Sequence, residues 1–121
     1  MIMQKKHQLD TYIIKDEVNI RKAMQKLDES HRKILFVIQN DYSIVGSLTD
    51  GDIRRWILKG KMLNEPVSSV CNLSPICVAP DYSLGDVKQS MLEHKVQAIP
   101  VVDSDNKIID VLFWDVVFDD E

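Results

Sequence analysis

An internal repeat constrains this chain more than any other feature of its sequence. Residues 20–46 match residues 84–110 without a gap, at a constant shift of 64 positions. The match aligns the apolar positions of a helix, a buried strand and the turn after it, for example Ile20 with Leu84 and Leu27 with Met91. A gapless self-match of this length indicates a duplicated structural unit. Each half is too small to bury much surface alone, so we expect a pseudo-twofold pair with a central cleft.

Each half shows the element order strand, helix, strand, strand, helix. The first half has expected strands at 12–14, 34–38 and 44–48, with one helix capped by Asn19 and another after residue 48. The second half has expected strands at 76–78, 98–102 and 107–113, with a helix capped by Ser83 and a short one from Asp115. The sequence therefore predicts an α+β fold of two βαββα repeats, at 12–60 and 76–121. A connector at 61–75 is expected to hold one helical turn near Val67. The polar and basic residues 1–11 are expected to be a frayed helix or partly an expression-tag remnant.

The stretch from Gly46 to Arg55 leads from an apolar strand through a polar turn into a helix. Asp is a good N-cap residue, so we expect this helix to begin near Asp50 or Asp52 and to end near Gly60. A helix N-terminus offers free backbone N–H groups and partial positive charge. Both features suit a bound phosphate.

The side chains of this turn fit a nucleotide. Thr49 adds a hydroxyl donor, and Arg54 and Arg55 add positive charge and forked donors. The two oxygens of Asp52 can accept from both hydroxyls of a ribose. Thr49 and Asp52 together indicate the monophosphate end of a nucleotide. The alternative is that the two residues only cap the helix and that the arginines are solvated.

Composition excludes several classes of function. A formal net charge of −4, without a long basic run, argues against a nucleic-acid binder. No apolar stretch approaches the roughly 20 residues of a membrane span, and residues 1–10 lack the apolar run of a signal peptide. Two cysteines suggest a reducing compartment, so we expect a cytoplasmic protein. The cysteines and the three histidines lack metal-ligand spacing, so no metal site is expected.

The chain resembles the CBS (cystathionine-β-synthase) domain in three features. These are the repeat, the Gly-x-x-Thr-x-x-Asp turn formed by Gly46, Thr49 and Asp52, and the run 98–103. The resemblance covers residues 12–117. It implies a tandem pair that binds an adenine nucleotide between its repeats, forms a homodimer and regulates an attached enzyme. The ligand would be AMP, ADP or ATP, and no cofactor is required. The site would consist of residues around the phosphate (Thr49, Asp50, Gly51, Arg54, Arg55), at the ribose (Asp52) and at the adenine (Ile14, Phe36, Val37).

A narrower pattern extends the resemblance, namely the run 49–55 followed by Leu58, Gly60, Val70 and Pro75. It is similar to CBS pairs that precede sugar-phosphate nucleotidyltransferase domains in bacterial surface-polysaccharide pathways. Sugar-phosphate isomerases of the arabinose-5-phosphate type carry a similar turn near their C-terminal end. Because little precedes the pair here, the sequence favours the nucleotidyltransferase context. We expect a regulatory region excised from such an enzyme, without catalytic activity of its own.

The second half departs from the nucleotide turn. Asp110 replaces the glycine, Phe113 replaces Thr49, and Asp115 follows Phe113 by two residues instead of three. Phe113 cannot donate to a phosphate, so this second site is expected to be weak or dead for phosphorylated ligands. One alternative function is a structural dimerisation module with helix contacts through Trp56, Met91 and Leu92. A further alternative is a small phosphohydrolase that uses Asp50 and Asp52.

Overall fold

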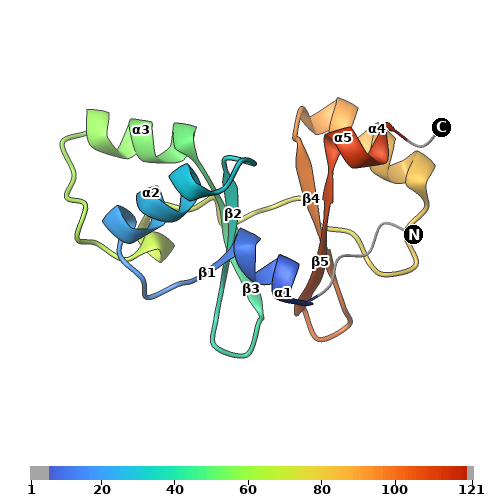
Figure 1. Cartoon of the computed structure of the whole chain (residues 1–121), viewed down its shortest axis with the longest axis horizontal. Helices are drawn as coiled ribbons and strands as arrows, with labels where there is room; N and C mark the ends of the chain where they lie inside the picture. Colours follow the sequence, from blue (N-terminus) through green and yellow to red (C-terminus); the bar gives the residue numbers. More distant parts are fainter. Residues whose placement is uncertain (1–5, 120–121) are drawn as a thin grey trace.

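The structure is a computed structural model that describes residues 6–119. It has two halves with their sheets facing inward and, apart from the N-terminal helix, their helices outward (Figure 1). The first half contains α1 (Lys6–Leu9), the 3-10 helix η1 (Asp10–Tyr12), β1 (Ile13–Lys15), α2 (Ile20–Glu29), β2 (Ile34–Ile38), β3 (Ile44–Thr49) and α3 (Asp50–Leu58). The 3-10 turn η2 (Val67–Ser69) lies in the connector. The second half contains α4 (Leu84–His94), β4 (Ala98–Val102), β5 (Ile108–Phe113) and α5 (Trp114–Val117).

The two halves keep the 64-residue shift in their backbone pairing. β2 and β3 are antiparallel with Ile34 opposite Thr49, and β4 and β5 are antiparallel with Ala98 opposite Phe113. Both hairpins change register at the same place, between residues 37 and 38 and between 101 and 102. The α+β fold of two repeats is thus confirmed.

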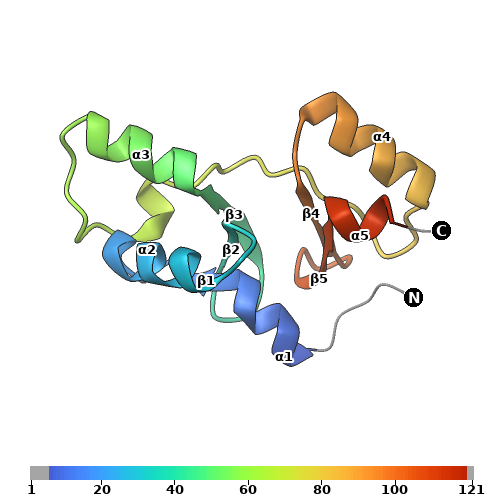
Figure 2. The same ribbon diagram turned by 45° about the horizontal axis from the view of Figure 1, so that its top comes forward.

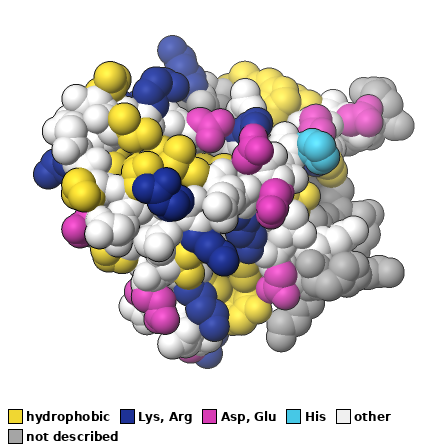
Figure 3. Space-filling model, turned by 60° about the vertical axis from the view of Figure 1, so that its left-hand side comes forward, with side chains coloured by type: hydrophobic (Ala, Val, Ile, Leu, Met, Phe, Trp, Pro, Cys, Tyr) yellow, Lys and Arg dark blue, Asp and Glu magenta, His cyan; other side chains and the backbone are white. Residues whose placement is uncertain are grey.

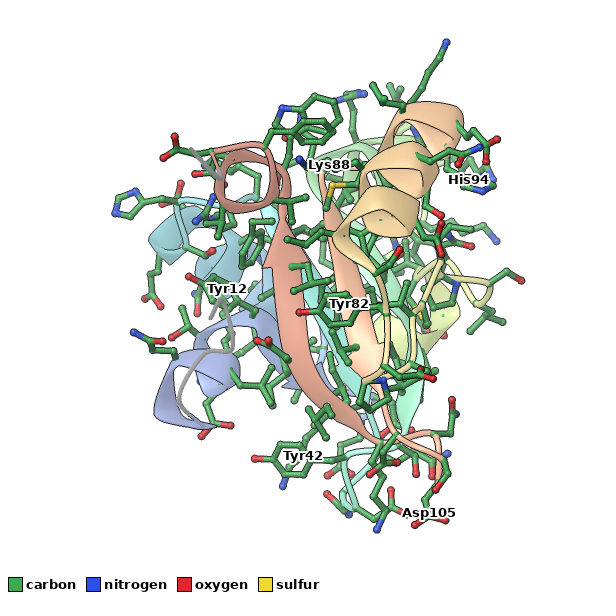
Figure 4. All side chains as sticks on the ribbon, turned by 90° about the vertical axis from the view of Figure 1, so that its right-hand side faces the viewer. Tyr12, Tyr42, Tyr82, Lys88, His94 and Asp105 are labelled. Atoms are coloured by element: carbon green, nitrogen blue, oxygen red, sulfur yellow. The ribbon has the colours of Figure 1, made fainter. Side chains whose placement is uncertain are left out.

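A pseudo-twofold relation joins the two hairpin turns. The Ile44 N–H donates to the Asn106 carbonyl at 3.0 Å, and the Ile108 N–H donates to the Tyr42 carbonyl at 3.0 Å. These two bonds are exchanged by the 64-residue shift. Tyr42 and Asn106 also share a left-handed backbone, with φ of 72° and 64°. Figure 4 shows Tyr42 and Asp105 at the same end of the strands, where these turns meet.

Three apolar clusters hold the fold together. Leu35 and Val37 face α2 and α3, whereas Ile99 and Val101 face α4 and α5. The alternate residues of both sheets meet in a shared central cluster that includes Phe36, Ile38, Ala98, Ile108 and Phe113. Since successive side chains of a strand point to opposite faces, each sheet packs on its own helices and on the other half. Neither half has a complete core by itself.

The predicted strand at 76–78 is wrong in extent, because only one parallel bridge forms, between Val78 and Val101. In the first half, β1 pairs with β2 over three residues, and the Asp16 N–H extends the pairing to the Ile38 carbonyl at 2.8 Å. Pro80 occupies the position equivalent to Asp16, and Pro100 stands in the partner strand β4. Proline has no N–H to donate, so the pairing stops on both sides of Val78.

The connector leaves α3 and crosses to the second half (Figure 2). It contains the helical turn that the sequence predicted near Val67. Farther on, Asn72 pairs with β3, since the Ser47 N–H donates to the Asn72 carbonyl at 3.0 Å and the Asn72 N–H donates to the Ser47 carbonyl at 2.8 Å. Residues 1–5 of the expected N-terminal helix lie outside the described residues. No helix in residues 6–119 is long and apolar enough to cross a membrane.

Candidate functional site

The turn at the start of α3 is closed by a reciprocal capping box. The Asp52 N–H donates to Thr49 Oγ1 at 3.3 Å, and the Thr49 N–H donates to Asp52 Oδ2 at 2.9 Å. The helix begins at Asp50 as expected, but its N-cap is Thr49 and not an aspartate. Its last turn is followed by Gly60 in a left-handed conformation, at φ +75°. Capping by Thr49 and Asp52, one of the two sequence interpretations, is therefore present.

Asp52 links the capping box to a cationic side chain. Arg55 Nη2 donates to Asp52 Oδ1 at 2.8 Å, and the Asp52 side chain is only 18% exposed. Oδ2 also accepts from the Thr49 hydroxyl at 3.1 Å. These contacts fix the carboxylate at the mouth of the turn, beside the N-terminal amides of α3.

A cavity of about 700 Å³ opens in front of this turn, between the two halves. Its polar wall comes from the first half and the connector. The loop before β4 and the first residue of β4 form the opposite side. The lining residues are Arg32, Lys33, Ile34, Phe36, Ser47, Thr49, Asp52, Arg55, Asn72, Pro75, Ile76, Lys95, Val96, Gln97 and Ala98. Its volume lies within the range of roughly 300–1,000 Å³ found for small-molecule sites.

The structure brings together four of the residues that the sequence singled out. Thr49, Asp52, Arg55 and Phe36 line the cavity. Ile14 and Val37, expected at the adenine, instead belong to the buried core under α2 and α3. This correction follows from strand geometry, because Val37 and Phe36 are neighbours in β2 and point to opposite faces. The apolar side chains that line the cavity instead are those of Ile34, Ile76 and Val96.

Asp50 and Arg54, also expected near the phosphate, face elsewhere. Both line a separate groove between α2 and α3, together with Ile53 and Ile57. Gly51 occupies the first turn of α3, where an added Cβ would lie 3.2 Å from Arg55 Nη1. Because Asp50 and Asp52 line different hollows, they do not form the carboxylate pair that a phosphohydrolase would need.

Sequence reasoning missed the wall of the cavity that comes from the second half. Lys95, Val96, Gln97 and Ala98 lie between α4 and β4, far from the turn in sequence. The signal that could have found them is the repeat itself. A pseudo-twofold pair places the loop before the second strand of one half opposite the nucleotide turn of the other half.

Comparison with known proteins decides the family. The CBS domain family model matches residues 2–59 and 67–112. The chain belongs to the CBS domain family. Its relatives include the arabinose 5-phosphate isomerase GutQ of Salmonella typhi, 30% identical over 90 residues, or 74% of this chain and 28% of that protein. An uncharacterized protein of Helicobacter pylori strain J99 is 29% identical over 101 residues, or 83% of this chain and 31% of that protein. The chain thus spans less than a third of the length of these curated relatives.

Solved structures show the same arrangement of a CBS pair. CBSX2 in complex with AMP has a TM-score of 0.81 and 26% identity, covering 97% of this chain and 90% of that one. The cytosolic domain of the Mg²⁺ channel MgtE in complex with ATP has a TM-score of 0.75 and 17% identity, covering 90% of this chain and 44% of that one. The second likeness shows the fold alone. Structural neighbours of this CBS pair therefore include proteins that bind AMP or ATP.

A smaller cavity of about 250 Å³ lies at the pseudo-twofold equivalent position in the second CBS repeat. Phe113 replaces Thr49 there, and Val116 replaces Asp52. The Phe113 ring packs against Tyr12 with ring centres 4.8 Å apart, and the Arg32 guanidinium lies 4.1 Å from its centre. Three side chains thus occupy the space in front of the second turn.

Two acidic residues of the second repeat, Asp110 and Asp115, are held by hydrogen bonds from neighbouring groups of the protein. Asp110 is fully buried and accepts from the Val111 N–H at 2.8 Å, and it does not line the smaller cavity. Burial of Tyr82, which lies over the β4–β5 sheet (Figure 4), raises the pKa of that side chain, and Asp110 adds to the shift. Asp115 is held by Arg32 Nη1 at 2.6 Å. The hydrogen bond from Arg32 lowers the pKa of Asp115.

The remaining side chains with reactive or ligating groups lie apart. Burial raises the pKa of both thiols, Cys71 and Cys77, which disfavours the thiolate. His94 is the last residue of α4 (Figure 4), and it does not line the cavity. Within residues 6–119, no group of three His, Cys, Asp or Glu side chains could hold a metal ion.

The three residues suggested for dimer contacts differ in their exposure to solvent. Met91 is fully buried in the core of the second repeat and cannot contact another chain. Leu92 is 59% exposed, and Trp56 is partly buried with its Nε1 donating to the Met62 carbonyl at 2.7 Å. Only Trp56 and Leu92 remain available at the surface.

Proposed function

We propose that this CBS pair is a non-catalytic sensor that binds an adenine nucleotide in the cavity between its repeats. The observation that carries the proposal is the shared cavity itself. It combines the Thr49 hydroxyl, the start of α3 and the Asp52 carboxylate with apolar side chains, in a volume of about 700 Å³. CBSX2, which matches nearly the whole chain, has been solved with AMP. That match supports an adenine nucleotide over other ligands of similar size.

The contacts of the turn suggest how such a ligand would lie. The α-phosphate would face the Thr49 hydroxyl and the first N–H groups of α3, where partial positive charge favours an anion. Asp52 Oδ1, now 2.8 Å from Arg55, is the carboxylate oxygen that a ribose hydroxyl would share. The base would lie against the apolar side chains of Phe36, Ile76 and Val96.

Binding would regulate an attached enzyme by shifting a population of arrangements. A ligand that contacts both repeats stabilises the arrangement in which those contacts form, and the attached domain responds to that shift. We propose a sugar-phosphate nucleotidyltransferase as the parent enzyme, in the cytoplasm. The GutQ relatives also make an arabinose 5-phosphate isomerase a candidate parent.

Isothermal titration of the chain with AMP, ADP and ATP tests the proposal, alongside the variant Asp52→Ala. The matched control is Asp86→Ala, because Asp86 occupies the same third position of α4 after the Ser83 N-cap and lies outside the cavity. We expect saturable binding near one ligand per chain, lost in Asp52→Ala and kept in Asp86→Ala. Circular dichroism must show both variants folded. If the folded Asp52→Ala variant binds nucleotide with unchanged affinity, Asp52 is not part of the binding site.

A second candidate function is a structural dimerisation module, favoured by the surface beside the α2–α3 groove. Ile57 is 46% exposed and Leu58 is 78% exposed there. Figure 3 shows hydrophobic side chains gathered on the face of the first repeat, among lysine and arginine. Light scattering with and without nucleotide, on the chain and on Leu58→Asp, distinguishes the two functions. A dimer that Leu58→Asp disrupts, without heat from any nucleotide, would favour the dimerisation module.

A further inference from the structure

The cavity carries a charge opposite to that of the chain as a whole. The chain has a formal net charge of −4. Four cationic residues, Arg32, Lys33, Arg55 and Lys95, line the cavity, against the single carboxylate of Asp52. A hollow lined by one sign of charge concentrates its field and attracts ligands of the opposite sign. The cavity is therefore built for an anion with considerable charge.

Two of these four cations are already engaged. Arg55 pairs with Asp52 at 2.8 Å, and Arg32 pairs with Asp115 at 2.6 Å. Among residues 6–119, the side chains of Lys33 and Lys95 form no ion pair, and both are exposed. The two lysines come from different repeats, one before β2 and the other at the end of α4. Lys33 also borders the α2–α3 groove, but within the cavity the two lysines are the cations that no described carboxylate already holds.

Both lysines occupy turns of the backbone at the edge of the cavity. Lys33 and Lys95 have left-handed conformations, with φ of 61° and 55°. Glycine adopts this region without steric cost, whereas other residues lose of the order of 1 kcal/mol. At Lys95 this conformation ends α4, as is common at helix C-termini. Two long cationic side chains thus occupy positions at the cavity where glycine would be less strained.

We propose that the cavity selects nucleotides with more than one phosphate, and that Lys33 and Lys95 contact the phosphates beyond the first. The inference rests on the proposed function. The single phosphate of AMP would be met by the Thr49 hydroxyl and the N-terminal amides of α3, while Arg55 stays paired with Asp52. AMP would leave Lys33 and Lys95 without counter-charge. The further phosphates of a di- or triphosphate would supply negative charge to both lysines, one from each repeat.

Titration calorimetry with AMP, ADP and ATP, without Mg²⁺ and at low ionic strength, tests this selectivity. The test variant is Lys33→Asn with Lys95→Asn, because asparagine tolerates the left-handed conformation. The control is Lys59→Asn, an exposed lysine after α3 that does not line the cavity. With about threefold for each lysine, we expect ATP to bind roughly tenfold tighter than AMP to the unchanged chain. The double variant should bind both with similar affinity, whereas the control keeps the preference.

Each outcome separates this inference from the proposed function. Equal affinity of the unchanged chain for AMP and ATP overturns the selectivity and leaves the nucleotide site standing. A preference for ATP that survives in the double variant overturns the role of the two lysines. Loss of AMP affinity in the double variant, equal to the loss of ATP affinity, also overturns it. No binding of any of the three nucleotides overturns the proposed function and this inference together.

Discussion

The guanidinium of Arg32 lies 4.1 Å from the ring centre of Phe113, so a residue of the first repeat closes the cavity of the second. Tyr12 packs against the same ring from the first half, with ring centres 4.8 Å apart. At the equivalent place in the first repeat, Thr49 opens onto a cavity nearly three times as large. The duplication therefore produced one open hollow and one that side chains narrow.

Phe113→Ala should destabilise the fold strongly, because Phe113 is only 4% exposed and packs in the cluster shared by both repeats. Removing a buried phenylalanine typically costs about 3–5 kcal/mol of unfolding free energy. Urea unfolding followed by circular dichroism measures the loss. The control is Val116→Ala, since Val116 is 39% exposed on the next turn and should cost far less. A similar, small loss of unfolding free energy in both variants would contradict the tight packing of Phe113 in front of the second turn.

The Arg32–Asp115 pair predicts a specific response to acid. The hydrogen bond and charge of Arg32 lower the pKa of Asp115 in the folded chain. The folded chain therefore binds a proton less readily than the unfolded chain. The resulting stabilisation is present above the ordinary aspartate pKa and disappears as the pH falls through the lowered value. The contribution is small, because the Asp115 side chain is 64% exposed.

An NMR titration of the Asp115 carboxyl carbon in the chain and in Arg32→Gln measures this shift. Glutamine keeps most of the side-chain length and removes the charge. We expect the pKa of Asp115 to rise in the variant, while that of Asp41, whose pKa is lowered mainly by Ser43, stays in place. An Asp115 pKa that Arg32→Gln leaves unchanged would exclude the pair as its cause.

The element order could be predicted because each signal was local. Asn19 and Ser83 cap their helices as expected, with bonds of 2.8 Å to the Lys22 N–H and 3.0 Å to the Asp86 N–H. The 64-residue shift then fixed the pairing of the halves. Strand 76–78 is shorter than predicted because Pro80, just after it, and Pro100, in the partner strand, have no N–H to donate.

The walls of the site were less predictable than the turn. The run 34–38 is apolar throughout, so no alternation tells which residues face the cavity. Phe36 and Val37 were both selected, and only Phe36 lines it. In the helix after the turn, Arg54 and Arg55 are adjacent, and about 100° of rotation separates them. Arg55 therefore faces the cavity while Arg54 faces the α2–α3 groove.

Gly46→Ala should destabilise the chain through a close backbone contact. A Cβ at this position would lie 2.3 Å from the carbonyl oxygen of Asn72, which is main chain and cannot turn away. Overpacking of this kind typically costs about 1–3 kcal/mol, and here it also disturbs the Ser47–Asn72 pairing at the cavity wall. Thermal unfolding measures the effect.

The matched control for this change is Gly85→Ala, in the first turn of α4. The nearest atom to an added Cβ there is Ser83 Oγ at 4.0 Å, so the methyl group has room. Alanine is a better helix former than glycine by up to about 1 kcal/mol, so we expect Gly85→Ala to be neutral or stabilising. Equal destabilisation by both changes would argue against the close approach of Asn72.

Thr49→Ala and Ser83→Ala separate helix capping from ligand binding, because both residues cap a helix and only Thr49 lines the cavity. Loss of either N-cap should cost about 1 kcal/mol of unfolding free energy, so urea unfolding is expected to shift similarly in both variants. Nucleotide affinity, measured by calorimetry on the folded variants, should fall only in Thr49→Ala. Thr49→Ser keeps both the cap and the hydroxyl donor and should restore affinity. Nucleotide affinity that falls equally in Thr49→Ala and Ser83→Ala would mean that Thr49 acts through stability alone.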